Sequence, residues 1–570
     1  MITARPPRLS IVLGCFCLSL LLLRPAAALD PQLAAQANAL IPPPSPPKPN
    51  FLVIVADDMG FSDAGCYGGE IETPNLDRLA AGGLRFTQVY STARCWPSRT
   101  CLLTGYYAQQ VRMDPPQGRL PAWARVAPHY LKPLGYRCYQ SGKWHLMGAP
   151  RVVADGGFDR SYKIDDHDRF FSPKAHTQDD RPLPAVPPEG GFYLTTYIAD
   201  CALDYLKEHA EKHARRPFFL YLAFTSPHFP LHALPDDVAR YRDRYLEGWD
   251  AVRQRRFERM RQMGIVRCDL SERQSQTIPS WNLAEEELKR RIGPGEAGRA
   301  VPWNDLSDAQ KKFQAAKMAV HAAMIDRMDR EIGRVLDQVR AMGVLENTVV
   351  LFVSDNGASA EQIIRGDGHD PAAVPGSAKS YLCLGPGWST ASNTPFRLHK
   401  SWVHEGGIAS PLIVHWPAGI RQHGQLRHTP GHFVDVLPTL FELAGAGPPG
   451  PWNGQTPPPV SGRSLVPALA GDVEIARDYL YWHHMTHRAV RVGDWKLVSA
   501  GGEKAEGPWE LFDLRNDRSE TTNLAERHPA KVQELAALWQ KCEDQFRQQA
   551  GPPEPKKTPA KKPRKQARKE

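Results

Sequence analysis

Runs of apolar, β-branched or aromatic residues that end abruptly in polar ones constrain the fold of this chain more than any other feature. Four such runs cover residues 51–56, 136–140, 218–224 and 348–354. Strands of this composition are typical of a parallel sheet that helices cover on both faces. Because the carboxyl ends of parallel strands meet at one edge of the sheet, the polar residues that follow are expected to form a site there.

The segments between these runs have the pattern of helices, as an α/β fold requires. The clearest helix begins near Ser307, and large apolar residues recur on one of its faces at steps of three and four: Ile325, Met328, Ile332, Val335 and Val339. We expect this stripe to pack in the core. Asp326, Asp329 and Arg330 are then expected on the solvated face, with Asp326 able to approach the sheet.

The polar residues after two of the runs are suited to a metal ion. Asp57 and Asp58 follow the first run, and Asp355 and Asn356 follow the last. Their side chains offer hard oxygen ligands, which suit Ca²⁺ or Mg²⁺ and suit zinc or copper poorly. One such pair alone is most simply a turn or a helix cap. Two pairs at two strand ends favour a divalent metal site.

The length and charge of the chain limit what else it can be. A chain of 570 residues with 42% hydrophobic residues can bury a large core, as several domains or as one large α/β domain with an appendage. Its net charge of +9 lies at the two ends, in Arg5, Arg8 and Arg24 and in residues 551–570, where eight basic residues face two acidic ones. The body is neutral, so we expect no nucleic-acid partner.

The ends of the chain have their own composition. Residues 1–28 are typical of a secretory signal peptide, with a basic start, an apolar stretch too short to span a membrane and three alanines at the cleavage site. Residues 29–49 form a proline-rich spacer, and residues 549–570 a basic tail that we expect to be disordered. The protein is therefore expected to be exported, periplasmic or secreted, with no membrane span.

One segment carries a specific resemblance. Residues 95–105 read CWPSRTCLLTG, and residues 55–60 read VADDMG. Together they resemble the sulfatase family, in which the cysteine of C-x-P-S-R is oxidised and x-x-L-L-T-G follows. The similarity continues from residue 50 to about residue 524, through TPNLDRLA at 73–80, GKWHL at 142–146, SPH at 226–228 and DNG at 355–357. The segment at 393–400, NTPFRLHK, is similar to the lysine-bearing segment of the family, and residues 241–265 to an insertion of bacterial arylsulfatases.

The resemblance implies the architecture. The expected fold is an α/β domain of alkaline-phosphatase type, a mixed sheet between helices, over residues 50–445. A smaller α+β domain follows over residues 446–548, with an antiparallel sheet built from residues 479–482, 489–492 and 495–498 and from the closing strand near residue 511, together with a helix.

The resemblance also implies the chemistry. Cys95 is expected to be converted by a formylglycine-generating enzyme to 3-oxoalanine, that is Cα-formylglycine. Its hydrated form is a gem-diol, in which one hydroxyl attacks the sulfur of a sulfate monoester and deprotonation of the other releases sulfate. An unmodified thiol would stay sulfated.

The family carries one metal ion, usually Ca²⁺, on the positions of Asp57, Asp58, Cys95, Asp355 and Asn356. It also implies a set of catalytic residues: Cys95, Arg99, Lys143, His145, His228 and Lys400. Arg99 would orient the modified residue, and the two lysines would contact sulfate. His228 and Lys400 would share the leaving oxygen, and His145 would accept the second diol proton.

Two other functions stay open on the sequence. Relatives with the same C-x-P-S-R segment hydrolyse phosphonate or phosphate esters, and an inactive homologue could bind a sulfated glycan instead of cleaving it. His404, His167, Asp166 and Asp168 lie in segments that could line a pocket, but they match no family position and receive no role.

Overall fold

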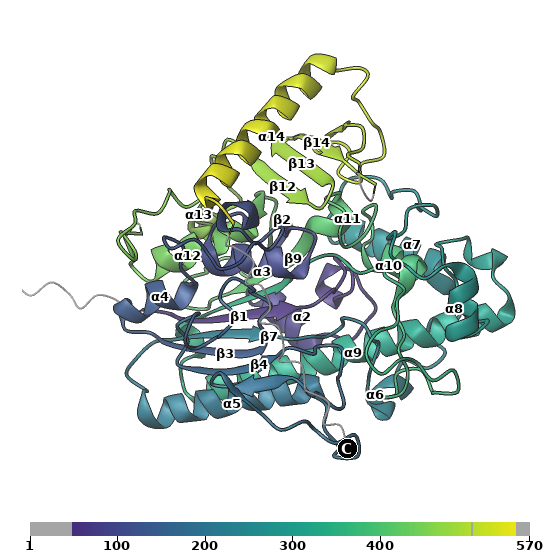
Figure 1. Ribbon diagram of the computed structural model, residues 1–570, viewed down its shortest axis with the longest axis horizontal. Coiled ribbons are helices and arrows are strands. Elements are labelled where there is room, and N and C mark those ends of the chain that lie inside the picture. The colour runs from purple at the N-terminus through teal and green to yellow at the C-terminus, as the bar shows by residue number, and fades with distance from the viewer. Residues whose placement is uncertain (1–47, 448, 503–504, 554–570) are drawn as a thin grey trace, which may run out of the picture. The chain divides into compact units, whose positions relative to one another are not determined.

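The larger part of the chain is built around one mixed sheet (Figure 1). The structure is a computed structural model that describes residues 48–447, 449–502 and 505–553. Within this part of the chain eleven strands make up the sheet: β1 (Asn50–Ala56), β2 (Leu84–Tyr90), β3 (Arg137–Lys143), β4 (Arg160–Ile164), β5 (His176–Gln178), β6 (Arg181–Pro182), β7 (Phe218–Ala223), β8 (Thr348–Ser354), β9 (Ala409–His415), β10 (Gln425–Arg427) and β11 (Gly431–His432).

The four runs singled out in the sequence become neighbours at the centre of this sheet. Strands β8, β1, β7 and β3 lie side by side and are parallel, whereas β9 pairs antiparallel with both β8 and β2. The sheet is thus mixed, which confirms the predicted fold class. Strand β3 continues to Lys143, three residues past the predicted end, because residues 141–143 pair with β4.

Helices cover both faces of the central strands, and Figure 1 shows α5 and α9 below them and α3, α4 and α12 above. Side chains of β1 alternate between two cores: Leu52 and Ile54 pack with α5 and α9, and Phe51 and Val53 with α3 and α12. The helices are α2 (Pro74–Ala81), α3 (Cys95–Thr104), α4 (Ala127–Leu131), α5 (Leu194–Lys212), α6 (Pro235–Ala239), α7 (Gly248–Gln262), α8 (Glu285–Arg291), α9 (Asp308–Ala341), α10 (Gly385–Ser392), α11 (Glu405–Ile408), α12 (Val436–Leu443), α13 (Val466–Ala470) and α14 (Pro529–Ala550).

Helix α9 begins where the sequence indicates, because the Ser307 hydroxyl caps it by accepting the backbone N–H of Gln310. Its predicted apolar stripe is fully buried. The prediction of a solvated face for Asp329 and Asp326 was wrong, since both side chains are buried. The partners of these two carboxylates come from distant segments of the chain, and the periodicity of a single helix gives no information about them.

Asp329 connects α9 to the first turn of α2. Its carboxylate accepts the backbone N–H groups of Asn75 (3.0 Å) and Leu76 (2.8 Å), which have no partner within α2 itself. Asp326 accepts the hydroxyl of Tyr241 at 3.1 Å and pairs with Arg240 at 2.8 Å. Both carboxylates therefore hold loops of the large domain against the long helix.

A smaller antiparallel sheet follows, as predicted, with strands β12 (Leu480–His484), β13 (His487–Val492), β14 (Trp495–Ser499) and β15 (Glu510–Asp513). Helix α14 packs against it and ends at Ala550, so Gln549 and Ala550, assigned above to the tail, are helical. The predicted signal peptide, most of the spacer and residues 554–570 lie outside the described residues. In the described part of the chain, none of the helices has the length and apolar character that a bilayer crossing requires.

Buried ion pairs join the smaller sheet to helix α11 of the larger domain. Lys496 of β14 lies 2.9 Å from Glu405, the first residue of α11, and 2.7 Å from Glu520. Arg518 also contacts Glu405, at 3.0 Å. The segment between α10 and α11, which carries Lys400, is thereby held from both domains.

We expect Asp329→Ala to lower the free energy of unfolding by about 1–3 kcal/mol, because two buried N–H groups lose their acceptor. Chemical denaturation monitored by circular dichroism measures this change. Asp337→Ala is the matched control, since Asp337 lies on the exposed side of the same helix and, among the described residues, forms an ion pair with Arg340 alone. Equal effects of the two substitutions would contradict the assigned role of Asp329.

Candidate active site

The carboxyl ends of the four central strands place the predicted site residues together. Asp57 and Asp58 follow β1, Asp355 and Asn356 follow β8, His228 lies beyond β7, and Lys143 and His145 stand at and after the end of β3. Every one of these side chains except that of His145, which is partly exposed, is buried. Cys95 and Arg99 reach the same edge from α3.

Cys95 is the first residue of α3 and is 3% exposed. Arg94 before it is extended, so the free N–H groups of the first helical turn surround the Cys95 position. The Ser98 hydroxyl fixes the approach to the helix by accepting the backbone N–H of Thr92 at 3.0 Å. Together with the helix dipole, this geometry favours an anion beside Cys95.

Arg99 and Lys143 compensate the carboxylates near Cys95. Arg99 donates to Asp355 through Nε at 2.8 Å, with Nη2 at 2.7 Å from the same oxygen, and its Nη1 donates to the Lys143 carbonyl at 2.9 Å. Lys143 Nζ lies 2.5 Å from Asp57 Oδ2. Burial alone would raise the pKa of Asp57, but Lys143 and Arg99 bring it below its usual value.

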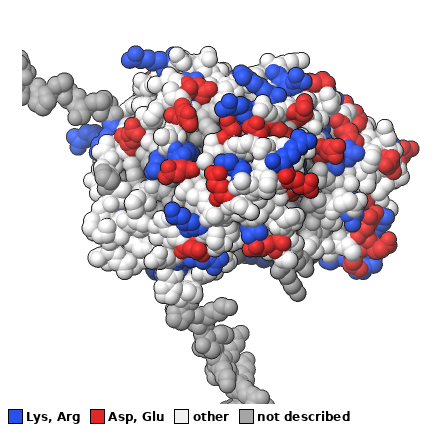
Figure 2. Space-filling model, turned by 90° about the horizontal axis from the view of Figure 1, so that it is seen from above, with Lys and Arg blue, Asp and Glu red and all other residues white. Residues whose placement is uncertain are grey.

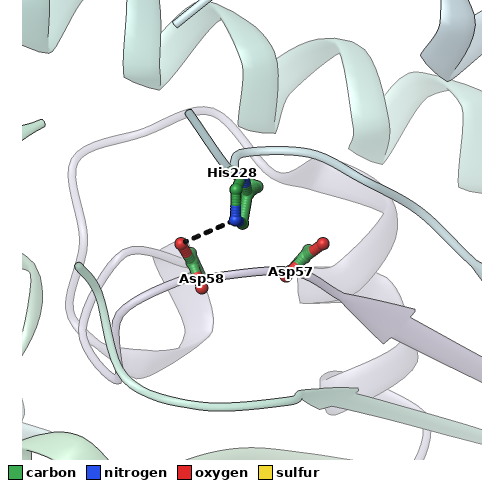
Figure 3. Close-up of side chains that lie close together, drawn as sticks. All are labelled: Asp57, Asp58 and His228. Atoms are coloured by element: carbon green, nitrogen blue, oxygen red, sulfur yellow. Dashed lines mark ion pairs between the residues drawn. The ribbon is translucent and has the colours of Figure 1, made fainter. Parts of the chain in front are cut away.

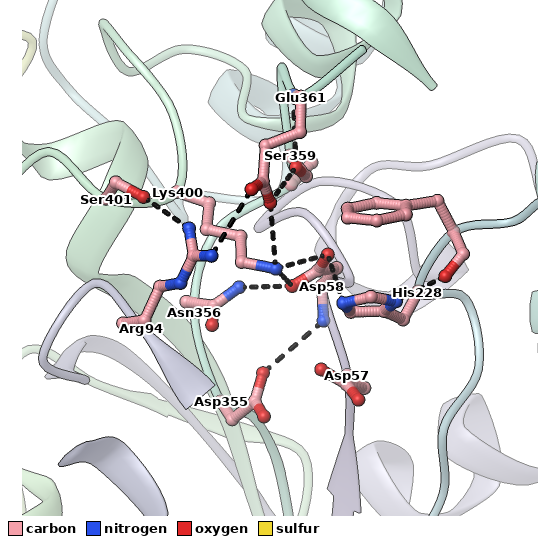
Figure 4. Close-up of polar contacts among 12 residues, drawn as sticks. Asp57, Asp58, Arg94, His228, Asp355, Asn356, Ser359, Glu361, Lys400 and Ser401 are labelled. Carbon is pink, nitrogen blue, oxygen red and sulfur yellow. Dashed lines mark hydrogen bonds and ion pairs between the residues drawn. The ribbon is translucent and has the colours of Figure 1, made fainter. Parts of the chain in front are cut away.

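Lys400 lies beside Asp58 and Glu361, as Figure 4 shows. Its Nζ is 2.8 Å from Asp58 and 3.3 Å from Glu361, while Asn356 donates its amide to Asp58 at 2.7 Å. The backbone N–H of Lys400 donates to the Ala358 carbonyl at 3.1 Å. The loop that follows Asp355 and Asn356 therefore positions Lys400.

Three histidines line the edge of the site. Figure 3 shows His228 beside Asp58, with Nε2 at 3.8 Å from Oδ2. The ring of His167 lies 4.9 Å from that of His228 and 5.6 Å from that of His145. Burial lowers the pKa of all three well below the ordinary range, so all three rings are neutral. Neutral rings at these positions can accept protons.

The acidic residues have the properties of a hard-cation site. Three potential ligand atoms lie within 4.8 Å of one another: one carboxylate oxygen of Asp57, the Sγ atom of Cys95 and one carboxylate oxygen of Asp355. Two buried oxygens, Asp57 Oδ1 and Asn356 Oδ1, have no hydrogen-bond partner among the described residues. Burial raises the pKa of Asp355 well above its usual value and also raises that of Asp58. Oxygen donors that lack a partner and need positive charge fit Ca²⁺ or Mg²⁺.

Sequence reasoning left out two residues that the structure brings to the site, Arg94 and Glu361, and it named His167 as a residue that could line a pocket without giving it a role. Glu361 is buried and pairs with Arg94 at 3.2 Å as well as with Lys400. Arg94 directly precedes Cys95, and this position alone could have indicated that it lies near the site. Glu361 and His167 lie on irregular loops, where no periodicity indicates which residues turn inward.

Comparisons with known proteins agree with this arrangement. The family model described as "Sulfatase" matches residues 49–446, and the one described as "N-sulphoglucosamine sulphohydrolase, C-terminal" matches residues 396–548. An uncharacterized sulfatase of Schizosaccharomyces pombe is 32% identical over 86% of this chain and 93% of its own length. An arylsulfatase of Klebsiella aerogenes is 31% identical over 74% of this chain and 91% of its own.

More distant relatives extend the likeness. An N-acetylgalactosamine-6-sulfatase of Canis lupus familiaris is 28% identical over 79% of this chain and 72% of its own. Among solved structures, i-CgsB in complex with k-i-k-neocarrahexaose superposes with a TM-score of 0.61 at 22% identity, covering 88% of this chain and 94% of the other. That likeness shows a shared fold.

We expect added Ca²⁺ to raise the thermal midpoint of the protein, because an ion that binds only the folded state stabilises it, by about 2.7 kcal/mol at a hundredfold excess over Kd. Asn356→Ala should lose most of this shift, since it removes one of the unpartnered oxygens. Thermal unfolding with and without Ca²⁺ after chelation measures the effect.

The exposed carboxylate variant Asp236→Asn is the control and should keep the full shift. A wild-type midpoint that does not respond to Ca²⁺ or Mg²⁺ at millimolar concentration would contradict a metal site here.

Proposed function

The chain belongs to the sulfatase family and is a sulfuric ester hydrolase, and we propose that it removes sulfate from a glycan with a formylglycine derived from Cys95 and one Ca²⁺ ion. The observation that carries the proposal is the position of Cys95. Its sulfur lies at a helix N-terminus, within 4.8 Å of ligand oxygens of Asp57 and Asp355.

The modification explains why a cysteine stands there. Oxidation to formylglycine would supply a hydrated aldehyde, whose two hydroxyls allow attack on sulfur and then release of sulfate. Arg99 is placed to orient this residue from the next helical turn, since its guanidinium is fixed by Asp355 and the Lys143 carbonyl. Arg99 would thus present its guanidinium to residue 95 from a fixed position.

The charges of the site support an anionic substrate. Four carboxylates, those of Asp57, Asp58, Asp355 and Glu361, are balanced by four cationic side chains in their contacts: Arg94, Arg99, Lys143 and Lys400. A bound Ca²⁺ would add two positive charges and act as a Lewis acid beside the sulfate oxygens. With the ion bound, the site would carry a net positive charge, which the negative charge of a sulfate group would complement.

Proton transfer is assigned to the neutral histidines. His145 Nδ1 has no hydrogen-bond partner among the described residues, so it can accept a proton from residue 95. His228 lies between Asp58 and the ring of Phe229, and Lys400 Nζ stands 5.4 Å from the centre of the same Phe229 ring. These two side chains are placed to share the oxygen of the leaving alcohol.

The names of the relatives support one class of substrate. One relative described above is named for a sulfated amino sugar, which supports a glycan sulfate as the natural substrate. Phosphate or phosphonate esters are the alternative, because the same nucleophile can attack phosphorus. A binding role without catalysis lacks support, since every predicted catalytic side chain is present. We further propose that the protein is exported and meets its formylglycine-generating enzyme before it folds.

Cys95→Ala should abolish hydrolysis of 4-nitrophenyl sulfate, a loss of at least about a thousandfold, because alanine provides no nucleophile. Initial rates on 4-nitrophenyl sulfate and 4-nitrophenyl phosphate measure this and give the preferred ester. Cys138→Ala, in the buried strand β3, is the matched control and should remain active.

The same preparations test the modification directly. The tryptic peptide that contains residue 95 should be lighter than the cysteine form by the mass of H₂S less that of oxygen, when the protein is made with a formylglycine-generating enzyme. A plain thiol in protein that turns over the ester, or an active Cys95→Ala variant, would refute the proposed nucleophile. Faster hydrolysis of the phosphate would favour the alternative.

A further inference from the structure

A cavity of about 470 Å³, open to solvent, is lined by the smaller sheet and by the β10–β11 edge of the larger one. Its walls come from residues 428–430 between these two strands, from the segment between residues 472 and 479, and from β12, β13 and the turn after β13. In the larger sheet, β10 lies at the opposite end from β3 and β4. None of the wall residues belongs to the site described above. The volume is in the range of about 300–1,000 Å³ that small-molecule sites have.

Arg491 of β13 is a buried cation in the wall of this cavity. The residue is 4% exposed. Its Nε donates to the Gly493 carbonyl at 2.8 Å, and its Nη1 donates to the Tyr90 hydroxyl at 2.8 Å. Among the described residues, no carboxylate forms an ion pair with Arg491, and no acceptor bonds to its Nη2. A buried charge without a counter-ion is costly, so an anion in the cavity would stabilise it.

The ion pairs behind Arg491 do not supply the missing negative charge. Tyr90 donates its hydroxyl to Glu405 at 3.0 Å and so connects Arg491 to the buried charges that join the two domains. This group has two carboxylates and three cations: Glu405, Glu520, Lys496, Arg518 and Arg491. Burial alone would raise the pKa of Glu405, but the three cations bring it below its usual value, so Glu405 is ionised. One positive charge is left over, and Arg491 is the cation of the group that lines the cavity.

A second buried guanidinium stands next to the same wall. Arg427 is the last residue of β10 and precedes His428, which lines the cavity. Arg427 is 2% exposed, and its Nη2 has no hydrogen-bond partner among the described residues. Burial lowers the pKa of Arg427, and the charge of Asp472 offsets this effect only in part. Two buried arginines thus make this side of the cavity positive.

The acidic side chains of the wall lie in water or have partners of their own. Asp472 and Glu474 are exposed, and Asp494 is half-buried. Asp472 accepts the backbone N–H of Thr429 at 3.1 Å, and Asp494 accepts Nε of Arg515 at 2.7 Å. Because water and salt screen exposed charges, these carboxylates offset the buried positive charge weakly.

The size and the composition of the wall indicate which kind of anion fits. The cavity is larger than a single sulfate or phosphate ion needs, and Val473, Ile475 and Tyr479 contribute apolar surface to it. An uncharged molecular body can pack against this surface. An oxygen of an attached carboxylate or sulfate group can accept a charge-assisted hydrogen bond from Nη2 of Arg491. The two features together favour an organic anion over an inorganic ion or a neutral molecule.

We propose that this cavity binds a small organic oxyanion, with its charged group at Arg491 and its uncharged body against Ile475 and Tyr479. The inference goes beyond the proposed function and does not depend on it. The ligand would bind next to the buried ion pairs that hold the segment carrying Lys400, because Arg491 reaches Glu405 through Tyr90.

Isothermal titration calorimetry of the full chain with two carboxylates, benzoate and D-glucuronate, tests the site at constant ionic strength set with sodium chloride. The two probes carry the same charged group on an apolar and on a hydroxylated body. At least one should bind with a Kd of about 1 mM or tighter. Tighter binding of benzoate would identify an apolar ligand body, and tighter binding of D-glucuronate a hydroxylated one.

Variants assign the binding to the cavity. Arg491→Gln should weaken it at least about tenfold, because the charged hydrogen-bond donor is lost. Val473 lines the cavity and is 42% exposed, so substitutions there preserve the fold. Val473→Glu should weaken binding about threefold, and Val473→Lys should strengthen it about threefold, since each adds a charge to the wall. Arg488→Gln is the matched control, since Arg488 lies on the same strand, pairs with Glu506 and does not line the cavity.

Several results would overturn the site. They are failure of the wild type to bind either carboxylate, equal binding by Arg491→Gln and the wild type, or the same affinity in both Val473 variants. The Val473 pair decides the matter if Arg491→Gln does not fold. Tighter Arg491-dependent binding of inorganic sulfate than of both carboxylates would overturn the organic ligand. Because binding is measured without turnover, an inactive protein would refute the proposed function and leave this inference standing.

Discussion

Three buried carboxylates at the ends of two neighbouring strands are the constraint on which the rest of the site depends. Asp57, Asp58 and Asp355 lose water on burial, and the cost of several kcal/mol per charge must be offset by cations and hydrogen bonds. Arg99 from α3 and Lys143 from β3 supply part of the compensation. Two buried oxygens of the site still have no hydrogen-bond partner among the described residues, and a hard divalent cation would supply the missing interaction.

Further ion pairs between carboxylates and cationic side chains connect the two domains. Lys400 contacts Asp58 and Glu361, and the segment that carries it ends at Glu405, which is buried against Lys496 of the smaller sheet. The loop that carries Lys400 buries Phe396 and Val403 in the core, and charge pairs at Lys400 and at Glu405 hold it in addition. The smaller domain accordingly supports the geometry of the larger one.

The charged centre has the side chains that an anionic group and a hard cation require. The centre contains cations, a helix N-terminus and the acidic ligands, which suit a sulfate group and a metal. The ring of Phe229 lies against His228 at the edge of this centre, with a centroid distance of 4.1 Å.

The sequence by itself determined the central strands, the long helix with its Ser307 cap and the residues around Cys95, because apolar runs, a helical period and a contiguous motif are local patterns. The matching of Asp57, Asp58, Asp355 and Asn356 rested on the rule that parallel strand ends meet. Only the tertiary structure decided that Asp329 is buried and that Glu361 pairs with Lys400. Those outcomes depend on partners dozens to hundreds of residues away, and a lone carboxylate on a helix or loop carries no pattern that identifies them.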